Sequence, residues 1–223
     1  VKNTDHEIHV FERSKDIYSS SISGIRADGK LFVSKEMGGN LDISLELQKK
    51  LVDFWIEKTG NGEHETGHSF ANMDYYRAFY EKGFQPVLSE FYHLGTDQLK
   101  GVLYNIYNEY SALENIRFHF QTPVENVEMQ DGRVMVDDHG SFDKVYVAVG
   151  RSGHKLIKAI VRKYPEIMLD STTVDIGVRF ELPDHVVEEL NREMYEFKVK
   201  YKSRTGYMVR TFCNNPSGYV VTE

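Results

Sequence analysis

The stretch Phe142–His154, with the sequence FDKVYVAVGRSGH, decides the predicted fold. Its central run, Val145–Val149, is apolar without alternation, which is typical of a strand buried on both faces of a parallel sheet. The strand is expected to end at Gly150, where the missing Cβ lets a ligand or another backbone come close. In open α/β sheets, ligands bind outside the carboxyl ends of the strands, so a ligand is expected at this point of the chain.

The composition limits the classes of function. The chain has 223 residues, enough for one large or two modest domains, and 40% of them are apolar, which is enough for a core. The net charge of −7 argues against nucleic acid as the main partner. No apolar run reaches the ~20 residues of a membrane helix, and the start of the chain does not read as a signal peptide. The single cysteine, Cys213, fits a reducing compartment, so we expect a cytoplasmic protein without a membrane partner.

Strands and helices are predicted to alternate along the first half of the chain. Glu7–Phe11 has the composition of a strand, and Glu12 and Arg13 follow it directly. An acidic residue at this place can accept hydrogen bonds from both hydroxyls of a ribose, although an ordinary surface glutamate is the simpler interpretation. The pattern further predicts a short strand at 31–33 and helices at 41–59, 74–82 and 98–113, the last capped by Thr96.

The next segment indicates a parallel pair followed by an antiparallel meander. The run 116–120 alternates like a strand, and a helix between two strands implies that the strands are parallel. Two further runs, 124–129 and 133–136, flank Asp131-Gly132, which predicts a hairpin. This meander leads into the apolar run at 145–149.

The last third of the chain is expected to form an antiparallel module. The pattern predicts a helix at 155–163, a half-buried strand at 174–182, a helix at 184–194 capped by Asp184, and strands at 197–201 and 207–212.

Two short motifs point to other kinds of site. Gly24–Leu31 nearly matches a phosphate-binding loop, but Leu31 stands where a hydroxyl must hold Mg²⁺, and we reject a nucleotide triphosphatase. The segment His64-Glu65-Thr66-Gly67-His68 satisfies H-E-x-x-H, which requires both histidines on one helix face. Neighbouring glycines favour a polar loop, so a zinc hydrolase is only a minority alternative.

The order of elements resembles the FAD-binding domain of the glutathione-reductase-type flavoprotein superfamily. More closely, the chain is similar to a group of bacterial FAD-dependent dehydrogenases. Short segments carry the resemblance, in the same order along the chain: Phe11-Glu12-Arg13, Ala27–Leu31, His93–Asp97, Val147–Gly150, Asp175–Arg179 and Arg210–Cys213.

The resemblance implies an FAD-dependent oxidoreductase that acts on an unidentified small molecule, with NAD(P)H as a candidate co-substrate. No catalytic residue is assigned, because the flavin itself carries the hydride chemistry. The residues that the resemblance places at the cofactor are Glu12 and Arg13 at the ribose, Val124 at the adenine, Ala148 in the strand 145–149 with Gly150 and Arg151 directly after it, and Asp28, Gly29 and Lys30 on the isoalloxazine side.

The chain departs from this family in what it lacks. The G-x-G-x-x-G turn that binds the pyrophosphate is absent, as is a late Gly-Asp segment, so we expect an internal segment of a longer flavoprotein. Cys213-Asn214-Asn215 also replaces the family's Cys-x-Cys, which leaves no thiol pair.

The expected fold class is α/β, a Rossmann-like FAD-binding domain with a mixed α+β substrate module. The expected domains are 1–153 with a helical insertion at about 35–92, then 154–212 for the substrate, with 213–223 returning to the first. The alternative is a non-catalytic module that kept the nucleotide-binding fold and lost its cofactor.

Overall fold

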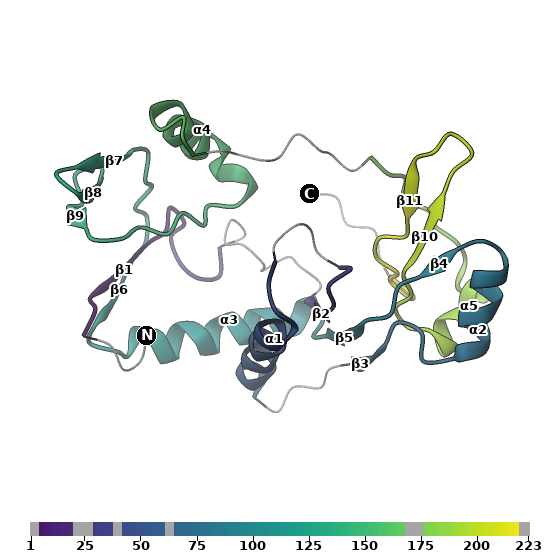
Figure 1. The fold of residues 1–223 in the computed structure, drawn as a ribbon. Coiled ribbons are helices and arrows are strands. Elements are labelled where there is room, and N and C mark those ends of the chain that lie inside the picture. Colours follow the sequence, from purple (N-terminus) through teal and green to yellow (C-terminus); the bar gives the residue numbers. More distant parts are fainter. Residues whose placement is uncertain (1–4, 20–28, 38–41, 61–64, 168–175, 219–223) are drawn as a thin grey trace. The chain divides into compact units, whose positions relative to one another are not determined.

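The structure is a computed structural model that describes residues 5–19, 29–37, 42–60, 65–167 and 176–218 (Figure 1). The chain forms two compact units. Unit 1 comprises residues 1–26 and 103–177, and unit 2 comprises residues 27–102 and 178–223. The predicted division at residues 153 and 212 differs from this grouping and stays a prediction.

The fold is mixed α/β, as the sequence indicated. The described residues form one parallel pair of strands and three antiparallel sheets. The finer prediction, a Rossmann-like FAD-binding domain, stays a prediction.

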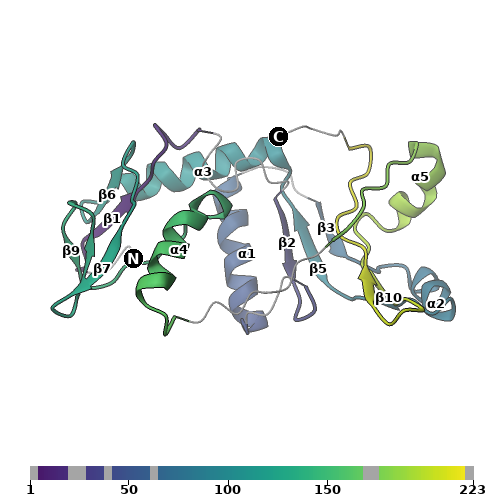
Figure 2. The same ribbon diagram turned by 90° about the horizontal axis from the view of Figure 1, so that it is seen from above.

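Unit 1 is built on the predicted parallel pair. Strands β1 (Ile8–Phe11) and β6 (Ile116–His119) run side by side, with Ile8 opposite Ile116 (Figure 2). An antiparallel meander follows, made of β7 (Val127–Gln130), β8 (Arg133–Val136) and β9 (Ser141–Phe142). Asp131 and Gly132 both have positive φ, 50° and 78°, which is the geometry of a type I′ hairpin turn. The predicted hairpin is therefore confirmed.

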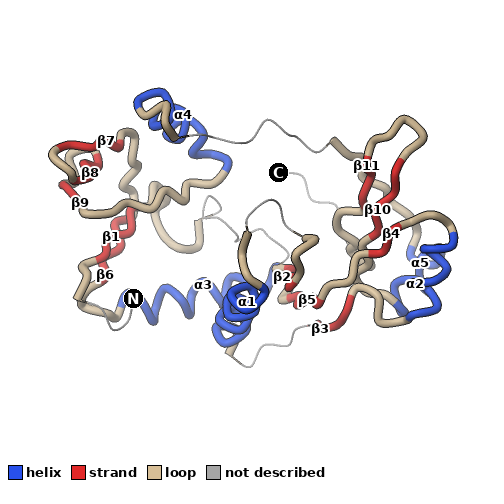
Figure 3. The backbone as a smooth tube through the Cα atoms, viewed as in Figure 1, coloured by secondary structure: helices blue, strands red, loops and turns tan. Residues whose placement is uncertain are grey.

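The predicted buried strand Val145–Val149 is wrong. The segment pairs with no strand among the described residues and is drawn as a loop after β9 (Figure 3). Tyr146 is 84% exposed. A run without alternation forms a buried strand only where another strand pairs with it and layers cover both faces. The β1–β6 pair does not include this segment, so the local pattern has no partner here. A 3₁₀ turn (Arg151–Gly153) and the predicted helix α4 (His154–Lys163) follow.

Unit 2 contains two antiparallel sheets of three strands. In the first, β5 (Glu90–His93) lies between β2 (Lys30–Val33) and β3 (Glu65–His68). In the second, β10 (Val199–Lys202) lies between β11 (Met208–Arg210) and β4 (Gln85–Pro86). The two strands predicted at 197–201 and 207–212 are confirmed as β10 and β11, with shorter bounds, and β10 also pairs with β4 from much earlier in the chain.

The helices predicted at 41–59, 98–113 and 184–194 are confirmed, and the second of them contains the boundary between the two units at residues 102 and 103. The Ser44 side chain accepts the Leu47 N–H and so caps α1 (Leu45–Thr59), which ends at Gly60. Helix α3 (Thr96–Ser111) has Thr96 as its first residue rather than its cap. Helix α5 (Asp184–Glu193) is preceded by Pro183 and has no side-chain cap, so the predicted capping by Asp184 is wrong.

The core of unit 2 is aromatic. Phe70, Met194 and Val199 are buried together, and three aromatic residues of α2 (Met73–Glu81) pack against them. Tyr75, Tyr76 and Phe79 of this helix therefore belong to the core packing of unit 2.

The predicted strand at 174–182 is wrong over its described part. Residues 176–182 pair with no described strand, although Ile176, Val178 and Phe180 alternate as a strand requires. Ile176 is 94% exposed. Alternation shows which side chains share a face, and it does not supply the surface that buries this face.

Candidate functional site

The carboxyl ends of β1 and β6 are locked together by backbone hydrogen bonds. Thr122 N–H donates to the Glu12 carbonyl at 3.0 Å, and Gln121 N–H donates to the Ser14 carbonyl at 2.8 Å. The Glu12 Oε1 atom accepts the Ser14 N–H at 2.7 Å. This bond fixes the carboxylate over the turn that follows β1, at the edge where parallel sheets bind ligands.

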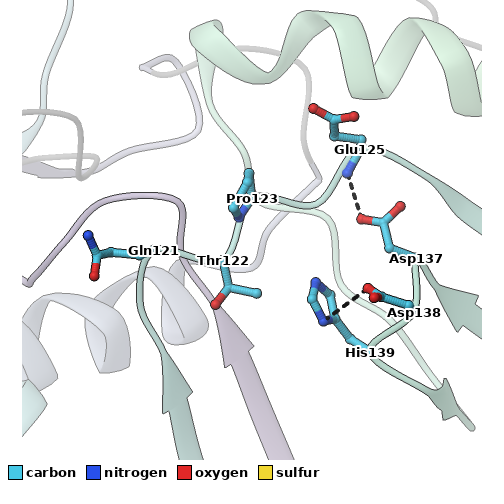
Figure 4. Close-up of a pocket in the computed structure, with 7 residues that line it drawn as sticks. All are labelled: Gln121, Thr122, Pro123, Glu125, Asp137, Asp138 and His139. Carbon is cyan, nitrogen blue, oxygen red and sulfur yellow. Dashed lines mark hydrogen bonds and ion pairs between the residues drawn. The ribbon is translucent and has the colours of Figure 1, made fainter.

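An open hollow of about 370 Å³ lies at this end of unit 1 (Figure 4). The segment that leaves β6 forms one side, and the turn after β8 forms the other. The hollow lies within the size range of small-molecule sites, ~300–1,000 Å³. Its lining consists of Gln121, Thr122, Pro123, Glu125, Asp137, Asp138 and His139.

Asp137 shapes this hollow. Its two carboxylate oxygens accept the N–H groups of Glu125 and Asn126, each at 2.8 Å. It also has a φ of 41°, a left-handed conformation that aspartate tolerates better than most residues. Together with the backbone bond from Asp137 N–H to the Asn126 carbonyl at 3.1 Å, these side-chain bonds fix the segment after β6 to the turn after β8.

Three histidines and two phenylalanines form an aromatic cluster in unit 1, in which Phe142 meets the rings of His9 and Phe11 edge-on. His9 Nδ1 lies 3.0 Å from His119 Nε2, and their rings stack with centroids 5.0 Å apart. Phe11 stacks on His119 at 4.8 Å and on His139 at 5.1 Å. The sequence pattern did not predict this cluster. The parallel register places Phe11 opposite His119, so a known register reveals part of it.

Burial lowers the pKa of His119 below its ordinary value of 6.5, and the neighbouring His9 and His139 lower it further. The His119 imidazole therefore binds a proton at a lower pH in the folded unit than in the unfolded chain. The stability from neutral His119 is complete above pH 6.5 and is lost as the pH falls through the folded pKa.

We therefore expect unit 1 to lose stability on acidification from pH 7 to 5, with a smaller loss in the variant His119→Phe, which keeps the stacking on Phe11. The measurement is the urea midpoint of unit 1 by hydrogen exchange at each pH. The exposed His185 gives the control, since His185→Asn should leave the pH dependence of unit 1 unchanged. An identical pH dependence in wild type and His119→Phe contradicts this assignment.

The predicted residue Lys30 is engaged in a buried ion pair in unit 2. Its Nζ atom lies 2.7 Å from Glu196 Oε2, and it also donates to Asn215 Oδ1 at 2.9 Å and to the Asn214 carbonyl. Lys198 Nζ approaches the other carboxylate oxygen of Glu196 at 2.5 Å, outside hydrogen-bond geometry. The pairing was missed because its members lie far apart in the sequence.

The other predicted cofactor residues of unit 1 occupy different environments. Arg13 is exposed and Val124 is half-buried, next to the residues that line the hollow. Ala148 and Gly150 are exposed, and Gly150 has a φ of 59°. Arg151 begins the 3₁₀ turn that precedes α4. The structure thus brings Glu12 and the segment around Val124 to one end of unit 1.

The backbone conformation at residue 29 in unit 2 requires a glycine. Gly29 is buried with a φ of 72°, and a Cβ there would lie 3.1 Å from the Leu94 Cβ atom. Its predicted neighbour Asp28 lies outside the described residues.

The H-E-x-x-H motif does not form the helix that a zinc hydrolase needs. Glu65–His68 is strand β3, so the polar loop favoured from the sequence is also wrong, while His64 lies outside the described residues. Where the structure describes the chain, no three His, Cys, Asp or Glu side chains come together as a metal site.

Comparisons with known proteins give one weak relative. No protein-family model matches the chain, and no solved structure matches it. An uncharacterized protein of Clostridium beijerinckii is 27% identical over 146 residues, which cover 58% of this chain and 26% of that protein. The chain thus spans about a quarter of the length of the relative that it matches. None of the described helices is long and apolar enough to cross a membrane.

Proposed function

We propose that this chain is part of an FAD-dependent oxidoreductase and that unit 1 holds the adenosine end of the cofactor. One observation carries the proposal: Glu12 follows β1 at the shared carboxyl end of a parallel pair, beside an open hollow. Ligands of open α/β sheets bind at this end of the strands. The meander that follows β6 matches the order of the flavoprotein fold that the sequence resembles.

The orientation of Glu12 suits a ribose. Oε1 is held by the Ser14 N–H, which leaves Oε2 to accept hydroxyl hydrogen bonds. Charge-assisted bonds of this kind are about twice as strong as neutral ones. The hollow beside Thr122 and His139 offers room and a polar wall for the base.

The fit extends only to the adenosine half of the cofactor. A Gly-rich pyrophosphate turn is absent from these 223 residues, and Lys30 is used by its ion pair with Glu196. FAD would supply the hydride chemistry when bound, while Glu12 would bind and orient its ribose.

The intact protein is expected to purify with bound FAD, and Glu12→Gln is expected to weaken FAD binding about tenfold, since it removes a charged acceptor worth ~1.5 kcal/mol. FAD affinity is measured by flavin fluorescence during reconstitution of the apoprotein. Glu7→Gln is the matched control, because Glu7 lies before β1 and pairs with Arg117. A colourless protein that takes up no flavin contradicts the proposal.

One observation favours the non-catalytic alternative. Ala148 and Gly150, which should face the cofactor, are exposed and unpaired among the described residues. A fold that has lost its cofactor would tolerate the exposure of these two residues. The flavin content of the intact protein separates the two functions, because only the oxidoreductase retains FAD.

A further inference from the structure

Two lysines in unit 2 share a single buried carboxylate. Lys30 begins β2, whereas Glu196 and Lys198 lie just before β10. Glu196 and Lys198 are two positions apart, and the Lys198 ammonium lies against the Glu196 carboxylate. Each oxygen of Glu196 faces one ammonium group, at 2.7 Å for Lys30 and 2.5 Å for Lys198.

The two ammonium groups and the single carboxylate of this cluster are buried, so the excess positive charge is poorly compensated by water. The side chain of Glu196 is fully buried, and those of Lys30 and Lys198 are only 3% and 10% exposed. An ion removed from water costs several kcal/mol unless partners replace the water. The partners of Lys30 include Glu196, the Asn214 carbonyl and Asn215 Oδ1.

The Lys198 ammonium group has fewer partners than that of Lys30. Among the described residues its ammonium group meets one carboxylate oxygen, already shared with Lys30, and the faces of two aromatic rings. The Phe32 centroid lies 5.6 Å from Nζ and the Phe212 centroid 6.0 Å. An ammonium group carries three N–H donors, so donor capacity remains for an anion.

The aromatic neighbours select the kind of anion. Phosphate sites use several convergent donors, mostly backbone N–H groups or arginine forks, and Lys198 is a single point charge between two rings. Phe212 is 72% exposed, so it offers an open apolar face beside the charge. These features fit a carboxylate attached to an apolar body.

The backbone holds the two groups in place. Val199 N–H donates to Thr211 Oγ1 at 3.0 Å, and Thr211 N–H donates to the Val199 carbonyl at 3.0 Å. Lys198 directly precedes Val199 and Phe212 directly follows Thr211, so both flank this pair of hydrogen bonds. The charge and the ring are therefore positioned before any ligand arrives, which lowers the entropy lost on binding.

We propose that Lys198, with Phe32 and Phe212, binds the carboxylate of an organic acid that has an apolar or aromatic body. The acid would be the substrate class of the oxidoreductase, and this reading rests on the proposed function. Binding itself needs no flavin, so the two proposals fail independently.

Benzoate is the probe, titrated into the intact protein at constant ionic strength and followed by calorimetry. We expect saturable binding that Lys198→Gln weakens at least about tenfold, because a charged hydrogen bond is lost. Phe212→Ala should weaken it several-fold. Lys200→Gln is the matched control: Lys200 lies two residues away, pairs with Glu36 and should leave binding unchanged.

Three results would overturn the proposal. One is the absence of saturable benzoate binding, and another is equal binding by wild type and Lys198→Gln. The third is inorganic phosphate that binds as tightly as benzoate and displaces it, which would assign the site to phosphate. If Lys198→Gln does not fold, the surface variant Phe212→Ala decides, and unchanged benzoate affinity in that variant counts against the site.

Discussion

Replacing Glu196 with Gln is expected to destabilise unit 2 by about 3–5 kcal/mol, because two buried ammonium groups lose their shared carboxylate. Glutamine has almost the same shape as glutamate, so packing around the side chain is preserved and the loss is electrostatic. A loss of this size is a large part of the stability of an ordinary domain, which is ~5–15 kcal/mol.

The measurement is hydrogen exchange of the β2, β5 and β10 amides in urea, since the protein has two units and a single unfolding transition cannot be assumed. Glu36→Gln is the matched control: Glu36 pairs with Lys200 at the surface, and such pairs contribute ~0–1 kcal/mol. Adding Lys30→Met to Glu196→Gln should recover part of the loss, because it removes one uncompensated charge. A Glu196→Gln protein as stable as wild type would show that the cluster is not buried as described.

Phe70→Ala is expected to cost unit 2 about 3–5 kcal/mol through the cavity that it leaves. Phe70 is buried and meets the rings of Tyr76 and Phe79 edge-on, with both centroids 5.9 Å away. Collapse into the cavity is limited, because α2 is held to α5 by the Tyr75 hydroxyl, which donates to Glu189 at 3.0 Å.

The urea midpoint of unit 2 measures this loss, with Tyr80→Ala as the control. Tyr80 is also an aromatic residue of α2 but is exposed, and truncating it should change stability by less than ~0.5 kcal/mol. Equal effects of the two substitutions would contradict the placement of the core around Phe70.

Local chemistry made several elements predictable. Gly60 predicted the end of α1, because a residue of free φ satisfies backbone groups that a helix leaves open, whereas the predicted start at residue 41 missed the cap at Ser44. Asp131-Gly132 predicted its hairpin for the same local reason. A helix between two strands also predicted the parallel pairing of β1 and β6 correctly.

Contacts between distant segments were not predictable in the same way. The pairing of β4 with β10 and the ion pair of Lys30 with Glu196 join parts of the chain with no pattern in common. The segments 145–149 and 176–182 were predicted wrongly for the same reason. The first has the pattern of a fully buried strand and the second that of a half-buried strand, but burial depends on a partner that the pattern does not contain.

For the candidate site, the sequence located Glu12 at the end of a strand. It did not reveal that Ser14 orients the carboxylate or that Asp137 fixes the segment after β6 to the turn after β8. Both interactions involve backbone N–H groups. Every residue except proline supplies such a group, so the residue types alone do not predict these hydrogen bonds.

The exposed run Val145–Val149 has a consequence for handling the chain on its own. Five residues rich in strand formers, with no proline and no charge, are a typical nucleus for self-association between chains. Asp143 and Lys144 stand directly before it and act as gatekeepers, and the Lys144 ammonium lies 6.0 Å from the centre of the Tyr146 ring. Removing these two charges would favour intermolecular strand pairing, so they protect the segment from aggregation as long as it stays uncovered.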